Sequence, residues 1–440
     1  MTTLDYTNKL QGYVPRKIYD HPHVTVLILS SNNICLLPRE ICTLTMLREL
    51  HLDHNKLTML PPELSNLTML HTLNVKWNYL QTLPSEICTL KQLKHLDVSQ
   101  NNLNELPSQI GDLLELEYLN VIGNQLQSLP TEIRSLKHLK GIFLSGSKLT
   151  MFPQELCILN SLEKLMILGG SFQTLPPEVQ TLNNMKILTL QGFKFMELPS
   201  AVCLMTSLQD LDLRYNQLTS LPEDISNLSR LKILNVSYNQ LTSLPQNIGR
   251  LSNLTSLLLE FNYMEVLPVA ICNLQNLQYL DVHKNCLTHL PDEIGNLTAL
   301  KELNVYGNKL TKLPKSLCQL KSLTRLNVSY NYLETLPVEI GEMESLHRFD
   351  ISHNKLAIVP KELGKLNTLC ILDLRNNNLT TLPPEMATMS SLTDLYLTQN
   401  NLSSIPREFE NMTCLRCLNV DECMMADISP KLSRVCIQLV

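Results

Sequence analysis

The sequence lacks the long apolar segments that mark membrane and secreted proteins. No apolar run approaches the roughly 20 residues of a membrane-spanning helix, so no integral membrane association is expected. Residues 1–9 are polar and contain no apolar signal core. The net charge of −5 argues against non-specific binding to nucleic acid. These features predict a cytoplasmic protein with no nucleic-acid partner.

The sequence also lacks the motifs of common enzymes and metal sites. It contains no GxxxxGK[ST], no GxSxG and no HExxH motif. Cys414 and Cys417 form a lone CxxC, and no second Cys/His pair with zinc spacing accompanies it. We therefore expect a protein that is not an enzyme, with no catalytic residues, no cofactor and no metal.

The main feature that is present is a repeat of 23 residues, marked by a leucine-proline step. Pro38 and Pro406 are 368 residues apart, which is sixteen periods of 23, and no insertion interrupts the series. A fixed period of this length is typical of a solenoid, in which stacked coils bury one continuous core. Aromatic residues make up only 5% of the chain, as a core built from leucine would give.

One repeat shows the physical logic, with Leu208 taken as position 1 in the numbering used below. Leu211 and Leu213 are two residues apart, so on a strand they point to one face, while the residues between them point to the other. The amide of Asn216 is expected to bond the backbone of neighbouring coils. Pro222 suits the first position of a short helix or turn, where its missing N–H would be unpaired anyway.

The repeats define three parts of the chain. Residues 1–23 are expected to form an N-terminal cap, a half-repeat without a leucine strand. Residues 24–414 contain seventeen repeats of 23 residues, and residues 415–440 form an atypical C-terminal repeat and cap. Terminal repeats must differ from the others because they cover the open ends of the core. This division predicts eighteen strands.

Six of the thirteen cysteines share position 19 of the repeat, and none lies in adjacent repeats. Two coils separate the closest of them by about 10 Å at the usual strand spacing, which exceeds the limit of about 7 Å for a disulfide. We therefore expect small apolar core residues at Cys42, Cys88, Cys157, Cys203, Cys272 and Cys318.

Three consecutive repeats lack the asparagine and carry Ser147, Gly170 or Phe193 instead. In the same coils apolar side chains occupy normally exposed strand positions, namely Phe143, Met166, Leu168 and Ile187. One interpretation is drift, with serine or packing in place of the amide ladder. The other is a local change of curvature beside an apolar contact patch.

Aromatic residues gather on the expected inner face. Position 8 holds Trp77 and, later in the chain, a series of tyrosine and phenylalanine residues near arginines. This composition resembles the hot spots of protein interfaces; the alternative is that the rings cover one another along the edge of the sheet. We predict that the concave face binds protein through Trp77, Asp212, Arg214, Tyr215, Tyr238, Phe261, Tyr263, Tyr279, Tyr306, Arg325 and Tyr330.

The consensus LxxLxLxxNxLxxLPxxIxxLxx, carried for example by residues 211–218 and 287–295, resembles the intracellular leucine-rich repeat class. It is most similar to the Shoc-type scaffolds of the Ras–Raf pathway and to the plant intracellular Ras-group repeats. The resemblance implies an α/β leucine-rich repeat solenoid, or horseshoe, with a concave parallel β-sheet and short helices or turns on the convex side. In the Shoc-type family the concave face gathers a Ras-type GTPase and a protein phosphatase catalytic subunit.

The leading hypothesis is a non-catalytic intracellular scaffold that binds a signalling protein on its concave face. The partner would belong to a Ras-type small GTPase pathway, as a small GTPase, a phosphatase or a kinase. The alternative is a receptor-like repeat protein that recognises ligands in innate defence.

Overall fold

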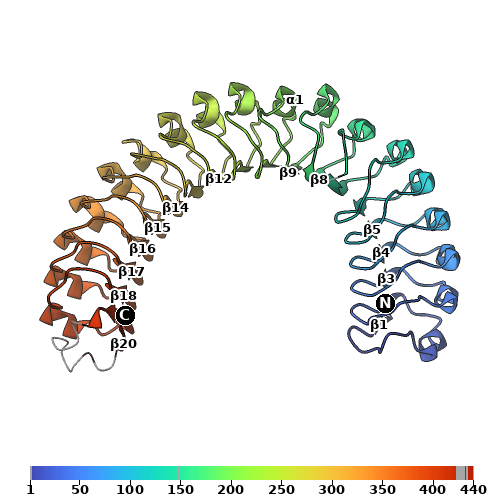
Figure 1. Ribbon diagram of the computed structural model, residues 1–440, viewed down its shortest axis with the longest axis horizontal. Helices are drawn as coiled ribbons and strands as arrows, with labels where there is room; N and C mark the ends of the chain where they lie inside the picture. Colours follow the sequence, from blue (N-terminus) through green and yellow to red (C-terminus); the bar gives the residue numbers. More distant parts are fainter. Residues whose placement is uncertain (1, 147, 423–431, 433–434, 440) are drawn as a thin grey trace. The chain divides into compact units, whose positions relative to one another are not determined.

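The computed structural model describes residues 2–146, 148–422, 432 and 435–439. These residues form two compact units, unit 1 (Met1–Gln217) and unit 2 (Leu218–Val440). Ser147 and most of the expected C-terminal cap, residues 423–431, 433–434 and 440, lie outside the described residues. In each unit the strands lie along one side and the short helices along the other (Figure 1).

Unit 1 contains a parallel sheet in which each strand pairs with the next one in the chain. Its described strands are β1 (Thr3–Asp5), β2 (Val26–Ile28), β3 (Glu49–His51), β4 (Thr72–Asn74), β5 (His95–Asp97), β6 (Tyr118–Asn120), β7 (Gly141–Gly146), β8 (Lys164–Gly170), β9 (Ile187–Gln191) and β10 (Asp210–Asp212). Its other side is covered by short helices, and those described are the 3₁₀ helices η1 (Arg16–Asp20), η2 (Arg39–Thr43), η3 (Pro62–Asn66), η4 (Ser85–Thr89), η5 (Ser108–Asp112), η6 (Thr131–Ser135), η7 (Gln154–Ile158) and η8 (Pro177–Thr181) and the α-helix α1 (Ser200–Cys203).

Unit 2 repeats this arrangement. Its described strands are β11 (Ile233–Asn235), β12 (Ser256–Leu258), β13 (Tyr279–Asp281), β14 (Glu302–Asn304), β15 (Arg325–Asn327), β16 (Arg348–Asp350), β17 (Ile371–Asp373), β18 (Asp394–Tyr396), β19 (Cys417–Val420) and β20 (Cys436–Leu439). Its described 3₁₀ helices are η9 (Glu223–Asn227), η10 (Gln246–Arg250), η11 (Val269–Asn273), η12 (Ile294–Asn296), η13 (Lys315–Gln319), η14 (Val338–Glu342), η15 (Lys361–Lys365), η16 (Pro384–Thr388) and η17 (Arg407–Asn411).

The predicted α/β solenoid with a parallel sheet is confirmed, but the expected eighteen strands are too few. The N-terminal segment was expected to lack a strand, and that prediction is wrong, because β1 pairs in parallel with β2 from Thr3 onward. Near the other end of the chain, β20 pairs with β19. The reason is physical: an open sheet edge leaves backbone groups unpaired, and one more short strand satisfies those of its neighbour.

The repeated residues take the roles that their spacing predicts, with one change. Leu211 and Leu213 are fully buried in the core. Pro222, however, stands just before the helix rather than in its first turn: its φ of −70° and ψ of 152° are extended, and η9 begins at Glu223. Proline therefore fixes the chain direction as it enters each 3₁₀ turn.

The asparagine ladder bonds neighbouring coils as expected. Asn308 donates from Nδ2 to the carbonyl oxygens of Val282 (3.0 Å) and Val305 (3.1 Å). Its Oδ1 accepts the backbone N–H of Leu287 at 2.9 Å. One buried amide thus pairs three backbone groups that no strand ladder reaches.

In the irregular repeat of unit 1 that carries Phe193, ring packing replaces this amide. Phe193 occupies the asparagine position, is 2% exposed, and lies 4.4 Å from Phe172 and 5.1 Å from Phe195 between ring centroids. A Cβ on Gly170 would stand 2.1 Å from the Phe193 ring, so glycine makes room for it. The apolar side chains of the same coils are half-buried, namely Phe143, Met166, Leu168 and Ile187. The described residues support the packing interpretation.

The cysteines at position 19 are buried in the core, as predicted. Burial raises the pKa of Cys42, Cys88, Cys157 and Cys272 to about 11, and that of Cys318 to about 12. Because the thiolate is the reactive form, these thiols are expected to resist iodoacetamide at pH 8 in the folded protein.

The exposed Cys35, Cys414 and Cys436 are expected to react under the same conditions. Peptide mass mapping after a short reaction checks this pattern. Labelling of Cys318 at the rate of Cys35 in the folded chain would contradict it.

Candidate functional site

The acidic and amide side chains at position 5 close the end of each strand. Asp281 accepts the backbone N–H of His283 through Oδ1 at 3.0 Å, and Asn304 does the same for Tyr306 at 3.2 Å. This local bond is an Asx turn, which short polar side chains favour. The polar column along the sheet therefore has a structural role.

Two of the predicted binding residues take part in this turn in unit 1. Asp212 is 7% exposed, accepts the backbone N–H of Arg214 at 3.1 Å, and forms an ion pair with its guanidinium at 2.8 Å. The carboxylate of Asp212 therefore lies beneath the surface, and the Arg214 side chain, which is 42% exposed, covers it.

The residue at position 8 has a left-handed backbone. In unit 2 the φ angles of Tyr238, Phe261 and Tyr330 lie between 53° and 54°. Other coils have Gly307 or Asn376 at this position, residue types that adopt this conformation readily. A bulky side chain here costs roughly 1–2 kcal/mol, so the fold alone does not favour aromatic residues at position 8.

Six rings of unit 2 form a continuous series, which we name the ring ladder: Tyr238, Phe261, His283, Tyr306, Tyr330 and His353. Successive ring centroids are 4.3, 5.0, 6.0, 5.1 and 3.8 Å apart. Where position 8 is Lys284 or Gly307, the preceding residue supplies the ring. Each coil from β11 to β16 thus contributes one ring.

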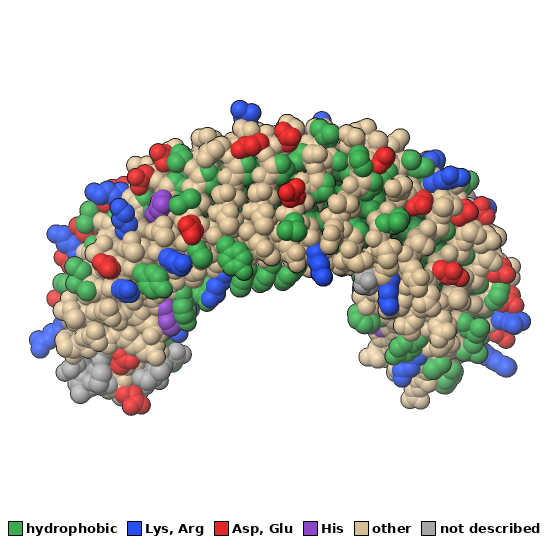
Figure 2. Space-filling view, turned by 45° about the horizontal axis from the view of Figure 1, so that its top comes forward, with side chains coloured by type: hydrophobic (Ala, Val, Ile, Leu, Met, Phe, Trp, Pro, Cys, Tyr) green, Lys and Arg blue, Asp and Glu red, His purple; other side chains and the backbone are tan. Residues whose placement is uncertain are grey.

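The ring ladder remains open to solvent although its members contact one another. Phe261 is 38% exposed and Tyr330 is 47% exposed. Tyr263 and Tyr332, two residues further along the same coils, are 60% and 47% exposed. Figure 2 shows hydrophobic, histidine and basic side chains together on the surface of unit 2, at the left of the picture. The rings thus cover one another in part, which was the alternative interpretation of the sequence, and they still remain partly exposed.

Hydrogen bonds and burial shift the pKa values of two titratable side chains beside the ring ladder, Asp281 and Tyr279. Burial alone would raise the pKa of Asp281, but hydrogen bonds from His283 and Asn304 bring it below the ordinary value. The Tyr279 hydroxyl donates to Asp281 at 3.2 Å, and burial together with that carboxylate raises the pKa of Tyr279 to about 12. Tyr279 is therefore a neutral, half-buried member of the face.

His353 provides a titratable marker of the ring ladder. Burial lowers its pKa below 6.5 and the nearby Arg375 adds to the effect, which outweighs the opposing charges of Asp373 and Asp350. The unfolded chain binds this proton more readily, so the folded state is expected to lose stability as the pH falls below 6.5. The Tyr330 ring contributes to the burial, and Tyr330→Asn is therefore expected to move the pKa back toward 6.5. A titration of the ring by NMR, assigned with His353→Gln, checks the shift; an unchanged pKa would show that Tyr330 does not shield the imidazole.

Unit 1 contains two of the predicted aromatic residues. Trp77 is 48% exposed and stacks on His54 with ring centroids 5.7 Å apart. Tyr215 is 47% exposed. Both share the left-handed backbone of position 8, with φ of 55° and 59°.

The last predicted residue, Arg325, lies on β15 and pairs with Glu302 at 3.2 Å. The sequence prediction missed three residues of the same face: His283, His353 and Arg348. A signal existed for the histidines, since each precedes or occupies position 8.

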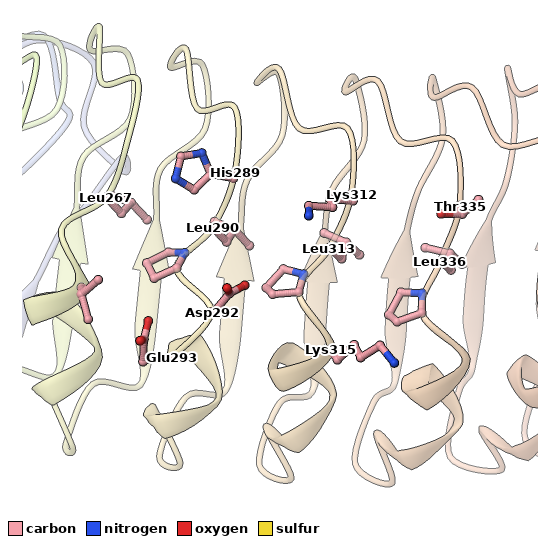
Figure 3. Close-up of a pocket in the computed structure, with 14 residues that line it drawn as sticks. Leu267, His289, Leu290, Asp292, Glu293, Lys312, Leu313, Lys315, Thr335 and Leu336 are labelled. Atoms are coloured by element: carbon pink, nitrogen blue, oxygen red, sulfur yellow. The ribbon is translucent and has the colours of Figure 1, made fainter.

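A hollow of about 700 Å³ in unit 2 lies at the leucine-proline steps of four coils. Figure 3 shows Leu267, Leu290, Leu313 and Leu336 in one row across these coils. Beside this hollow, η12 begins only at Ile294. Similar hollows lie at residues 36–62 and 150–178 of unit 1, so the groove is a property of the repeat.

Two further findings bear on function. Among the residues that the structure describes, no group of three or more His, Cys, Asp or Glu side chains could hold a metal ion. Within the same residues, none of the helices has the length and apolar character to cross a membrane.

Comparison with known proteins gives consistent matches. A family model described as a leucine-rich repeat region matches residues 7–119, 85–170, 207–284 and 267–355, and a leucine rich repeat model matches residues 365–425. No curated protein matches the chain.

Solved structures match over most of the chain. A leucine-rich repeat protein of Leptospira interrogans is 34% identical, with a TM-score of 0.78 and coverage of 98% of this chain and 99% of that one. YopM of Yersinia enterocolitica is 25% identical, with a TM-score of 0.66 and coverage of 100% and 91%. The plant peptide hormone receptor RGFR1, solved in complex with RGF2, is 25% identical, with a TM-score of 0.62 and coverage of 100% and 84%.

Proposed function

The chain belongs to the leucine-rich repeat family, and from that premise we propose that it is a non-catalytic intracellular scaffold. It holds a signalling protein on the strand face of unit 2, meaning the outward side chains of β11–β18 and the ring ladder that follows them. The observation that carries this proposal is the ring ladder, because half-exposed rings occupy backbone positions that disfavour them. Such rings supply a large, rigid contact area for a protein partner.

The partner proposed first is a component of a Ras-type small GTPase pathway: a small GTPase, or a phosphatase or kinase that acts with it. The support is the consensus of the repeat, which resembles that of the Shoc-type scaffolds. We place the protein in the cytoplasm on the same grounds.

A second candidate function is recognition of a ligand in the manner of a receptor of innate defence. The observation that favours it is the likeness to RGFR1, whose structure holds the peptide RGF2. A peptide ligand would also use exposed rings along a row of strands, so the two candidates share the surface and differ in partner and compartment.

Proximity labelling in the native cell tests the proposal. The chain, fused to a biotin ligase, is expected to label a small GTPase or its regulators, and the ring variant Phe261→Asn/Tyr330→Asn is expected to lose them. Labelling that is the same for both chains would contradict the proposed face. Labelling confined to proteins of the secretory route would favour the second candidate.

A further inference from the structure

Two arginines face each other on neighbouring strands beside the ring ladder. Arg325 on β15 and Arg348 on β16 are direct register partners. Like charges in this arrangement destabilise a sheet. Arg325 pairs with Glu302, whereas Arg348 forms no ion pair within 4 Å among the described residues. We name these two residues the arginine pair.

The nearby carboxylates lie deeper than the guanidinium groups. The Arg325 side chain is 64% exposed and that of Glu302 is 36% exposed. In a following coil, the Arg375 side chain is 46% exposed above Asp373, which is 9% exposed. The outermost charge on this part of the face is therefore positive, although the chain as a whole is acidic.

Asp350 forms no ion pair with Arg348 within 4 Å among the described residues, although the two charges attract each other. Its Oδ1 is engaged locally by the backbone N–H and the hydroxyl of Ser352, at 3.1 and 2.7 Å. Burial, and then the charge of Asp373, raise the pKa of Asp350 above the ordinary value, and this outweighs the lowering effect of the Ser352 hydrogen bonds and of the Arg348 charge. The carboxylate nearest in sequence to Arg348 thus has its hydrogen bonds in the strand-end turn and makes no direct contact with the guanidinium group.

A hollow of about 190 Å³ lies at the arginine pair. It opens on the strand face. The residues that line it are Tyr279, Glu302, Leu303, Asn304, Arg325, Leu326, Asn327, Arg348 and Asp350. Tyr306 and Tyr330 of the ring ladder follow the strands β14 and β15 that form it. A side chain in this hollow would therefore contact the arginine pair while its neighbours contact the rings.

We propose that the arginine pair binds a carboxylate of an acidic segment in the protein that the ring ladder holds, an inference that rests on the proposed function. The guanidinium fork matches a carboxylate in two parallel hydrogen bonds. Nucleic acid fits less well, because successive rings of the ladder contact one another with centroids at most 6.0 Å apart, which leaves no gap for a base, and the chain carries a charge of −5.

The test uses the full chain and two labelled peptides of equal length, one of glutamate and tyrosine, the other of lysine and tyrosine. Fluorescence anisotropy is expected to show that the acidic peptide binds at least about tenfold more tightly. Arg348→Glu is expected to weaken that binding about tenfold or more. The matched control Arg230→Glu, an exposed arginine of the same unit outside the strand face, is expected to leave it unchanged.

The outcomes separate this inference from the proposed function. Equal binding of the two peptides, no acidic binding, or an Arg348→Glu variant that binds normally would overturn the carboxylate site. Preferential binding of an oligonucleotide would overturn it as well. If the ring variant loses the cellular partner while Arg348→Glu keeps it, only the carboxylate site fails.

A stability measurement distinguishes a binding role of Arg348 from a structural role. Arg348→Gln removes one of two like charges, so the unfolding midpoint is expected to stay the same or rise. A marked fall in the midpoint would mean that Arg348 stabilises the sheet, and it would overturn the assignment of Arg348 to a partner.

Discussion

Asn308→Leu is expected to lower the free energy of unfolding by about 3–5 kcal/mol, because a buried unpaired polar group costs roughly 1–3 kcal/mol. The variant leaves the N–H of Leu287 and the carbonyl oxygens of Val282 and Val305 without their side-chain partner. Leucine has nearly the shape of asparagine, so the loss reports the hydrogen bonds rather than the volume. Denaturant unfolding followed by circular dichroism measures the change.

The matched control for Asn308→Leu is a substitution at Asn253. Asn253 is an exposed asparagine that donates a single bond, to the carbonyl oxygen of Ser229 at 2.7 Å. Asn253→Ala is expected to change stability by less than about 0.5 kcal/mol. If Asn308→Leu cost no more than this control, the amide would not be what joins the coils.

The chain itself shows why an apolar residue at this position needs help. Phe193 replaces the asparagine in unit 1, but it does so with two further phenylalanines and the space left by Gly170. The coil of Asn308, residues 300–322, contains no phenylalanine, so a single substitution cannot rebuild that cluster.

The second large effect concerns binding. The ring variant Phe261→Asn/Tyr330→Asn is expected to weaken binding of the partner by roughly 1,000-fold, since truncating a hot-spot aromatic costs about 2 kcal/mol and the two rings are in separate coils. Asparagine tolerates the left-handed backbone at both positions, which offsets the stacking that is lost. The variant is therefore expected to fold with nearly unchanged stability while it loses the partner.

Calorimetric titration with the partner protein that proximity labelling identifies measures this loss of affinity. Gln399→Asn changes a residue at the same left-handed position, where no ring is present, and is expected to leave the affinity unchanged. An affinity of the ring variant within about threefold of the original would contradict the proposed face, because one hot spot alone exceeds that change.

The periodic residues predicted the fold because every regular repeat has the same buried leucine positions and the same asparagine position. Leu211 and Leu213 define the buried face, and the asparagine at position 9 supplies the amide that the coils share. The strand β1 was missed because its residues do not repeat the consensus; it pairs through its backbone, which any sequence can offer.

The candidate site was harder to predict because side-chain direction depends on backbone angles that the pattern does not show. The ring ladder changes from position 8 to position 7 where the chain has Lys284 and Gly307, and reading one column at a time misses His283. The glycines at position 8 were the available signal for a left-handed backbone. Asp212 was assigned to the surface, whereas its Asx turn holds it beneath Arg214.

The most direct test of the central claim is photo-crosslinking from two positions of one coil. Phe261, 38% exposed in the ring ladder, and Val269, 54% exposed at the start of η11, are each replaced by benzoylphenylalanine. Binding on the strand face predicts that the partner is captured from position 261 and not from position 269. Capture from position 269 alone, with none from position 261, would contradict the account.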